Sequence, residues 1–535
     1  MKRPIRERRR RTASTPEYVE NLRPIVEEAT SDADRLIDEL QSYLRTLLRG
    51  GGLAILGVVL RRFLGVAYIF ILTTYLGAGG YGTYMLLVGA VTIMTTVAAM
   101  GLDQGVMRFV AQQRAGGSAD HIPGLVGTAS WMGLASSVVV VLAGWAVAAP
   151  VATRIFHQPA IGGMLRLMTI AVPAAVFCTL WLHATRGFQR MEETFWVSNL
   201  FEPAARIGLF LVLVLGGLEI GAAVGSYVVA AVAGAVLAGL ALRRLLTSGT
   251  RRREPGQAWA LISFSVPLLG AGMLAMIVEW TDTIMLGYFT APAQVGVYSV
   301  ALRVAALCGM IHFAFGSIFA PIIAELLHRN DMDGLDQLFK IDTRWVFTLT
   351  LPIFVLVVLL SRDILVIFGA EFAQGGLALI ILAGAVFYNS CVGSCGAIIR
   401  MAGWSRLVLA NTFAVTGLNF LLNLLLIPRF GILGAAIATG AAMVVGNFLG
   451  LAQVRWFLKL SPYDRKWAKP LAAGLAGGLV VVGFRLVAPV ASPVLSLALS
   501  TGVFSLCYVG LLLLQQLERE DLQMLRLLRA RVFGR

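Results

Sequence analysis

The sequence predicts an all-α integral membrane protein with about fourteen transmembrane helices: two pseudo-symmetric six-helix lobes and two extra C-terminal helices. Three observations predict this class. Of the 535 residues, 58% are hydrophobic and only 14% are charged, which is more apolar surface than a soluble core can hide. Apolar windows long enough for a helix to cross a bilayer, about 20 residues, recur along almost the whole chain. Lysine and arginine gather in alternate gaps between these windows.

The apolar windows can be followed in order from the N-terminus. They cover residues 50–76, 84–102, 124–148, 162–183, 195–216, 220–242, 260–288, 296–320, 345–361, 376–399, 406–427, 431–454, 471–489 and 493–514. In or beside the gaps after odd-numbered windows lie only Arg154, Arg362, Arg429 and Arg485, the last near the end of its window, whereas the other gaps hold clusters of basic residues. Because cytoplasmic loops carry most lysine and arginine, this alternation predicts fourteen spans with both termini in the cytoplasm of a multi-pass cytoplasmic (inner) membrane protein.

Polar segments flank the apolar windows. Residues 1–49 open with a basic run and continue through an acidic stretch. No apolar stretch follows the basic run directly, so we interpret 1–49 as a cytoplasmic tail and not as a signal peptide. Residues 516–535 combine charges with leucines and predict a short cytoplasmic helix that lies on the inner membrane surface.

An internal repeat divides the spans into two lobes. Three short matches share an offset of 213 or 214 positions (296 − 82, 400 − 186 and 434 − 221): Gly82-Thr83-Tyr84 with Gly296-Val297-Tyr298, Arg186 with Arg400, and Gly221-Ala222-Ala223 with Gly434-Ala435-Ala436. A six-helix unit has an even number of spans, so both copies should have the same orientation and be related by a pseudo-two-fold axis along the membrane normal. We expect the substrate path between the two copies. The predicted divisions are an N-lobe, a cytoplasmic linker, a C-lobe and two extra helices, at 50–245, 246–258, 259–458 and 468–515.

Charged residues inside apolar windows are candidates for function. A charge at the bilayer centre costs about 2.5–3.5 kcal/mol on insertion scales, so it needs a wet cavity, a partner or a route to the interface. Arg61 and Arg62 interrupt the first window, and Arg303 lies in the eighth. An alternative for the first two is that they extend to the cytoplasmic headgroups. Glu202 and Arg206 are four residues apart and predict a structural ion pair.

Two carboxylates in the seventh window form a second candidate site. Glu279 and Asp282 are three residues apart, on one face of a helix. Neighbouring carboxylates repel when both are ionised, which favours proton uptake by one of them. The pair is therefore a candidate for cation or proton coupling, and the alternative is that each carboxylate neutralises a nearby arginine.

The eleventh window carries a polar stripe at helical spacing. This stripe either lines the substrate cavity or forms hydrogen bonds with a neighbouring helix. Its members are Thr412, Thr416, Asn419 and Asn423.

Composition and motifs exclude several other classes. The net charge of +15 fits membrane orientation and anionic headgroups, and no nucleic-acid partner is expected. The five cysteines all lie in apolar windows and predict no disulfide framework, metal site or cofactor. The glycines of 77–82 match GxGxxG, but they follow a spanning helix and not a strand, and the sequence has no GxxxxGK[ST] motif. The short outer loops argue against a membrane-embedded polymerase or ligase, so we expect no enzyme.

Five segments carry a resemblance to a known family. They are Leu76-Gly77 through Tyr81-Gly82, Gly101-Leu102 through Arg108, Arg186-Gly187 through Gln189, Asp282 through Gly287, and Gly296-Val297-Tyr298 through Arg303. Over about residues 50–515 the chain resembles the polysaccharide transporters of the MOP superfamily, the branch of Wzx-type O-antigen and oligosaccharide flippases. The long polar tail departs from the short N-terminus that is usual in that family.

The resemblance implies a V-shaped pair of lobes around a cationic cavity. It implies alternating access that carries an undecaprenyl-pyrophosphate-linked oligosaccharide to the outer leaflet for surface polysaccharide (lipopolysaccharide O-antigen) biosynthesis. Arginines of the first and eighth helices, here Arg61, Arg62 and Arg303, would bind the pyrophosphate, and guanidinium groups suit phosphate oxygens in geometry and charge. Membrane lipids, a polysaccharide polymerase and chain-length proteins are the implied partners.

A MATE-like, cation-coupled multidrug exporter is the alternative function. Such an exporter would prefer carboxylates in its cavity and could use Glu279 and Asp282. Arginines outnumber carboxylates inside the windows, which favours an anionic substrate. The major facilitator transporters also have parallel six-helix halves, but the gap from Asp103 to Gly116 lacks their GxxxDRxGRR motif.

Overall fold

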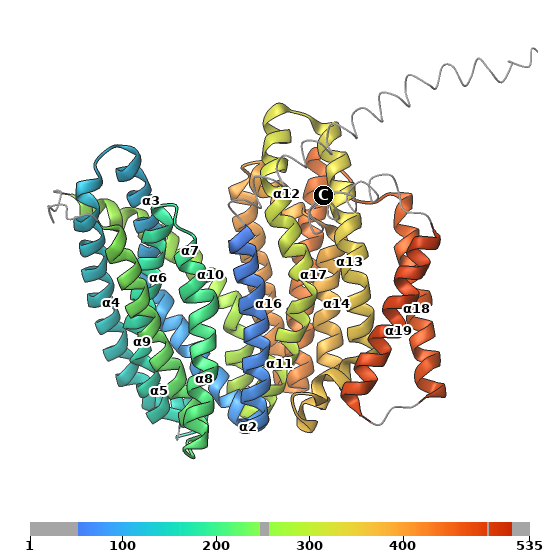
Figure 1. Cartoon of the computed structure of the whole chain (residues 1–535), viewed down its shortest axis with the longest axis horizontal. Coiled ribbons are helices and arrows are strands. Elements are labelled where there is room, and N and C mark those ends of the chain that lie inside the picture. The colour runs from blue at the N-terminus through green and yellow to red at the C-terminus, as the bar shows by residue number, and fades with distance from the viewer. Residues whose placement is uncertain (1–51, 160, 247–255, 489–491, 516–535) are drawn as a thin grey trace, which may run out of the picture.

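The computed structural model describes residues 52–159, 161–246, 256–488 and 492–515 (Figure 1). In these ranges the ordered elements are all helices, and 13 of them are long and apolar enough to cross a membrane. One of these helices, which begins at Gly52 and ends at Ala99, carries the first two predicted windows. In the described ranges, each of the fourteen windows therefore falls on helical residues. The predictions made for 1–49, for most of the 246–258 linker and for 516–535 lie outside the described residues.

The N-lobe contains the helices from α2 to α9. Their bounds are α2 Gly52–Ala99, α3 Leu102–Ala115, η1 Ala119–His121, α4 Ile122–Pro150, η2 Val151–Ile155, α5 Ile161–Thr169, α6 Ala171–Gly187, α7 Glu192–Thr194, η3 Phe195–Phe201, α8 Glu202–Leu215 and α9 Glu219–Leu245. Small side chains let these helices approach closely, as is usual in membrane bundles. On α9, for example, Gly239 faces the indole of Trp181 on α6, where an added Cβ would lie 2.8 Å from the ring.

The helix α2 turns sharply in its middle. Its 48 residues would extend about 72 Å if straight, more than twice the hydrocarbon thickness of a bilayer. Gly77 breaks the run with φ 62° and ψ −174°, a conformation that favours glycine. The neighbouring amide of Ala78 donates a hydrogen bond to the carboxylate of Glu371 on η4. The two halves of α2 therefore act as two transmembrane helices.

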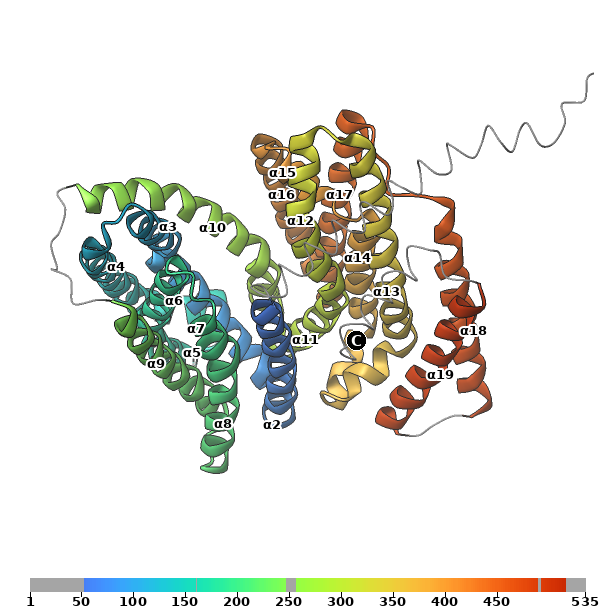
Figure 2. The same ribbon diagram turned by 45° about the horizontal axis from the view of Figure 1, so that its top comes forward.

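The C-lobe and the two extra helices follow. Their bounds are α10 Gln257–Phe289, α11 Pro292–Cys308, α12 Met310–Arg329, α13 Met332–Val366, η4 Ala370–Gly375, α14 Gly376–Val392, α15 Cys395–Met401, α16 Ser405–Phe430, α17 Ile432–Leu458, η5 Arg465–Trp467, α18 Ala468–Val487 and α19 Pro493–Leu514. The long helix α10 crosses from one lobe to the other (Figure 2). Its start packs on the N-lobe, because Gly105 of α3 meets Ser265 and Leu261 of α10. The pair α18–α19 packs on the outside of α13.

The two lobes form a V and touch where the repeat motifs meet (Figure 1). An added Cβ at Gly82 would lie 1.8 Å from the carbonyl oxygen of Pro292, and one at Gly296 would lie 2.2 Å from that of Ala78. The two contacts are equivalent under the repeat, because Ala78 corresponds to Pro292 and Gly82 to Gly296 at one offset of 214 (292 − 78 and 296 − 82), as a pseudo-two-fold axis requires. We call this region the convergent end. The lobes diverge at the opposite end, which carries α3 and the α12–α13 connection.

Candidate functional site

A central cavity of about 550 Å³ lies inside the V. It draws side chains from α2, η3, α8, α10 and α11, so both lobes contribute to its wall. Its size falls in the range of small-molecule sites, about 300–1,000 Å³. The lining residues include most of the charged side chains that interrupt the apolar windows: Arg61, Arg62, Glu202, Arg206, Glu279 and Arg303.

The structure brings Arg61, Arg62 and Arg303 to this one cavity. The guanidinium of Arg62 donates a hydrogen bond to the carbonyl oxygen of Ala306 at 3.3 Å and lies 5.9 Å from the ring centroid of Phe313. Arg303 comes from the C-lobe and approaches the N-lobe, where its guanidinium lies 3.9 Å from the sulfur of Met85. Among the described residues, none of the three arginines forms an ion pair with a carboxylate. Most of their donors are therefore open to an anion.

The other charges of the cavity only partly offset these arginines. Glu202 and Arg206 form the ion pair that their spacing predicts, with 19% and 25% of their side chains exposed. The guanidinium of Arg206 also lies over the ring of Tyr227, 4.3 Å from its centroid. Glu279 lines the cavity and is exposed. Four arginines against two glutamates leave a formal excess of two positive charges.

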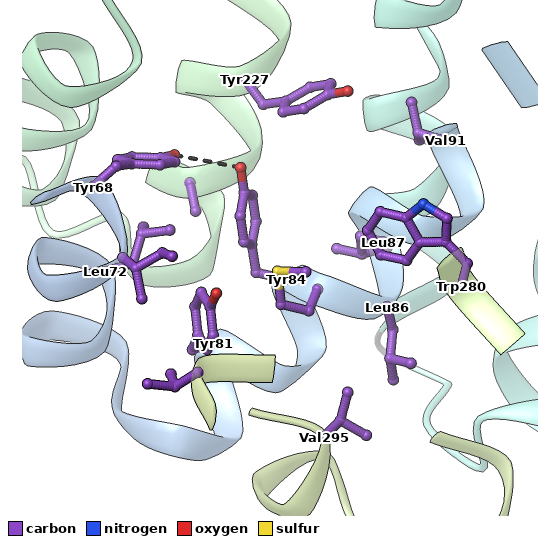
Figure 3. Packing of buried hydrophobic residues seen from close by; sticks show 14 of the residues in the cluster. Tyr68, Leu72, Tyr81, Tyr84, Leu86, Leu87, Val91, Tyr227, Trp280 and Val295 are labelled. Carbon is purple, nitrogen blue, oxygen red and sulfur yellow. Dashed lines mark hydrogen bonds between the residues drawn. The ribbon is translucent and has the colours of Figure 1, made fainter. Parts of the chain in front are cut away.

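Three tyrosines of α2 also line the cavity: Tyr68, Tyr81 and Tyr84. Figure 3 shows how they lie among the buried residues around them. The hydroxyl groups of Tyr68 and Tyr84 are 3.4 Å apart, and that of Tyr68 is 3.3 Å from Ser226 of α9. Their rings lie edge to face, with centroids 6.3 Å apart. Sequence reasoning missed these residues, because a tyrosine in an apolar window resembles an ordinary core residue.

Asp282 lies in a different place, inside the C-lobe. Its side chain is 3% exposed and accepts hydrogen bonds from four side chains of three helices. The donors are Tyr298 of α11 at 2.8 Å, Asn419 and Asn423 of α16, and Thr439 of α17. We call these five residues the Asp282 cluster. Every one of them carries an oxygen atom that could face a bound cation.

The helix α10 separates the predicted carboxylate pair. Glu279 faces the central cavity, whereas Asp282 faces the polar cluster of the C-lobe. The interpretation that both side chains share one face and repel one another is therefore wrong for this structure. A spacing of three residues still allows the two side chains to meet different neighbours, because the packing of α10 against α11 and α16 covers only one of them.

The polar stripe of α16 does not line the central cavity, so that prediction is corrected. Its two asparagines bind Asp282 across the helix interface. Its two threonines stay within α16: Thr412 donates to the carbonyl of Val408 at 2.8 Å and Thr416 to that of Thr412 at 2.7 Å. The asparagines thus follow the alternative, hydrogen bonds with a neighbouring helix, whereas the threonines follow neither prediction.

The repeat explains where the Asp282 cluster comes from. Its counterparts in the N-lobe, 213 or 214 positions earlier, include Tyr68 for Asp282 (282 − 68) and Ser226 for Thr439 (439 − 226). These two hydroxyls form the same inter-helix contact in the N-lobe that the carboxylate and Thr439 form in the C-lobe. Arg206 occupies the position of Asn419 (419 − 206). Likewise, Tyr68 contacts Tyr84 in the N-lobe as Asp282 contacts Tyr298, the counterpart of Tyr84 (298 − 84), in the C-lobe.

Comparisons with known proteins agree with this architecture. Over residues 47–327, more than half of the chain, the sequence matches the family described as polysaccharide biosynthesis protein, and residues 267–425 match MatE. The chain is 26% identical to the probable low-salt glycan biosynthesis flippase Agl15 of Haloferax volcanii, over 66% of this chain and 74% of that protein. It is 33% identical to the probable flippase AglR of the same organism, over 33% of this chain and 38% of that protein.

Solved structures share the fold at low sequence identity. The lipid II flippase MurJ in an inward closed conformation matches with a TM-score of 0.69 and 11% identity, over 85% of this chain and 97% of that chain. An inward-facing multidrug resistance MATE family transporter of the MOP superfamily matches with a TM-score of 0.61 and 13% identity, over 74% and 94%. The match over more than half of the chain shows that the chain belongs to the polysaccharide biosynthesis protein family.

Proposed function

We propose that this protein is a flippase for a lipid-linked saccharide and that its cargo is an oligosaccharide joined through pyrophosphate to a polyprenol such as undecaprenol. The observation that carries the proposal is the excess of arginines in the central cavity that have no carboxylate partner among the described residues. Arg61, Arg62 and Arg303 offer guanidinium groups from both lobes, and such groups bind phosphate oxygens in pairs and stay charged at any physiological pH. The relatives named as flippases support the same class of cargo.

The divergent V fits one state of an alternating-access cycle. The cavity lies between two repeat-related lobes, as the substrate site does in transporters built from parallel repeats. The positive-inside pattern supports cytoplasmic termini in a cytoplasmic membrane, with the divergent end of the V toward the cytoplasm. The cargo would enter there, and a polymerase with chain-length proteins would take it over on the outer side. The protein would bind and move its cargo without breaking a bond.

We further propose that the Asp282 cluster holds the coupling cation, either a proton or a small hard ion such as Na⁺. Carboxylate, hydroxyl and amide oxygens are the ligands that such cations prefer. The Oδ1 atom of Asn423 is buried and has no hydrogen-bond partner within the described residues. Glu279, on the next turn of the same helix, would sense the cargo in the cavity.

Arg303→Gln tests the cargo proposal. In a bacterial strain that lacks its own O-antigen flippase, the wild-type protein should restore surface polysaccharide and the variant should not, at equal membrane abundance. Arg166→Gln is the matched control, because Arg166 is exposed on α5 and does not line the cavity. Full restoration by Arg303→Gln would remove this arginine from the cargo site.

The second candidate function is a cation-coupled exporter of organic cations. The match of residues 267–425 to MatE and the acidic Asp282 cluster favour it. A lipophilic cation would need a net negative cavity, whereas this cavity has two more arginines than glutamates. Resistance of cells to a cationic dye, raised by the wild type and lost in Glu279→Gln, would favour this exporter over the flippase.

A further inference from the structure

We propose that the N-lobe wall of the central cavity is a sugar-binding subsite in which Asn199, Glu202 and Arg206 recognise the hydroxyl groups of the sugar next to the pyrophosphate. This inference rests on the proposed function. The three arginines would hold the pyrophosphate, and the N-lobe wall would hold the first sugar of the same cargo. The wall consists of η3 and the first turns of α8.

The backbone of η3 presents polar side chains to the cavity. Residues Phe195–Phe201 form a π-helix, a rare conformation that is frequent at functional sites. Ser198 and Asn199 of this segment both line the cavity. The close approach of η3 to α2 depends on Gly57, where an added Cβ would lie 2.4 Å from the amide nitrogen of Asn199. The segment is therefore held in place by packing and offers an amide that can donate and accept.

The ion pair that follows η3 adds stronger groups. Glu202 and Arg206 are both partly exposed, and both line the cavity. Tyr227 supports Arg206 from the side of α9, so the guanidinium is fixed in orientation. A carboxylate accepts hydrogen bonds from hydroxyl groups and a guanidinium donates them, and charge-assisted bonds of this kind are the strong ones.

The chemistry of this wall fits a neutral, hydroxyl-rich ligand. Glu202 neutralises Arg206, so the wall does not attract a second anion as Arg61, Arg62 and Arg303 do. A polyprenyl chain would cover the carboxylate, the amide and the guanidinium without offering any hydrogen bond beyond the ion pair, at a cost for each polar group that it removes from water. A sugar ring supplies donors and acceptors together. A cavity of about 550 Å³ has room for the pyrophosphate and the sugar attached to it.

The test compares two probes on the full chain in lipid nanodiscs. One probe is undecaprenyl pyrophosphate, and the other is the same lipid carrying one N-acetylglucosamine on the pyrophosphate. For Glu202→Gln we expect the affinity for the glycosylated probe to fall by about 10- to 100-fold relative to that for the bare probe, from loss of hydrogen bonds to a charged group. The affinity for the bare probe should not fall, because the change frees the Arg206 guanidinium from its ion pair. Asn199→Ala, which keeps the ion pair, should have the same selectivity with a smaller effect.

Matched variants separate the subsite from the proposed function. Glu219→Gln removes an exposed carboxylate of the same lobe, at the start of α9, and should change neither affinity. Arg303→Gln should weaken both probes. The sugar subsite is overturned if Glu202→Gln and Asn199→Ala weaken both probes equally or weaken neither. If Arg303→Gln instead leaves both affinities intact while Glu202→Gln acts on the glycosylated probe alone, the pyrophosphate proposal fails and the sugar subsite stands.

Discussion

The glycine contact at the convergent end should control which conformation the transporter occupies. In Gly296→Ala the new Cβ would lie 2.2 Å from the carbonyl oxygen of Ala78, and side-chain carbons essentially never come closer than 3.0 Å to such atoms. The second half of α2 and α11 must therefore separate by about 0.8 Å. The obstacle is backbone, so a rotamer change cannot relieve it.

The energetic consequence can be estimated from overpacking. Extra carbons in a tightly packed interior cost about 1–3 kcal/mol. In the opposite conformation of an alternating-access cycle, the lobes would separate at the convergent end. That conformation would not pay the overpacking free energy. The equilibrium should then shift toward it by about 5- to 150-fold. Gly82→Ala should act in the same direction, because its Cβ would lie 1.8 Å from the carbonyl oxygen of Pro292.

Pulsed electron paramagnetic resonance can measure the shift. Spin labels at Ser118 and Asp333, two exposed positions at the divergent end, would report the separation of the lobes in a background without native cysteines. We expect Gly296→Ala to move the distance distribution from the long distance toward a shorter one. Gly79→Ala is the matched control, because no atom lies within 4 Å of its new Cβ. An unchanged distribution in Gly296→Ala, with the control also unchanged, would refute the role of this contact.

Three further changes test other parts of the structure. Asp282→Asn should abolish the dependence of lipid flipping on a Na⁺ or proton gradient while leaving the affinity for undecaprenyl pyrophosphate intact, and an unchanged gradient dependence would rule out this coupling site. Glu371→Ala removes the acceptor of the Ala78 amide and should lower the free energy of unfolding by about 1 kcal/mol; an unaltered thermal midpoint in detergent would contradict this. Gly474→Leu would push a side chain against Leu351 and loosen α18 from α13, at a cost of about 1–3 kcal/mol. Gly483→Leu, which meets open space, should leave the midpoint unchanged, and equal midpoints for both variants would contradict that packing.

Much of the fold could be predicted from the sequence, because a spanning helix is specified by local composition. Each apolar window lies on a helix, including the two that share α2. The windows could not show where helices continue beyond the apolar run. The eighth, predicted to end at residue 320, is built from α11 and α12 and ends at Arg329. Its last turns carry Glu325, His328 and Arg329 among apolar residues and are still helical. A hydropathy pattern marks the membrane and not the end of the helix.

The candidate site was only partly predictable. Arg61, Arg62 and Arg303 meet in one cavity, and a charge in an apolar window is an informative signal since it must be explained by its surroundings. Which other side chains lie beside these arginines depends on how each helix is rotated about its own axis, and hydropathy does not specify that rotation. That rotation placed Asp282 inside the C-lobe instead of beside Glu279. The tyrosines of α2 carry no charge, and only the repeat relation of Tyr68 to Asp282 points to them.

Binding of undecaprenyl pyrophosphate to the combined variant Arg61→Gln, Arg62→Gln and Arg303→Gln tests the central claim most directly. All three arginines line the cavity and lack carboxylate partners among the described residues. Loss of several charge-assisted hydrogen bonds should weaken binding at least about 100-fold relative to the wild type and to Arg166→Gln. An affinity equal to that of the wild type, in a variant that is folded and inserted, would show that the anionic part of the cargo is held elsewhere.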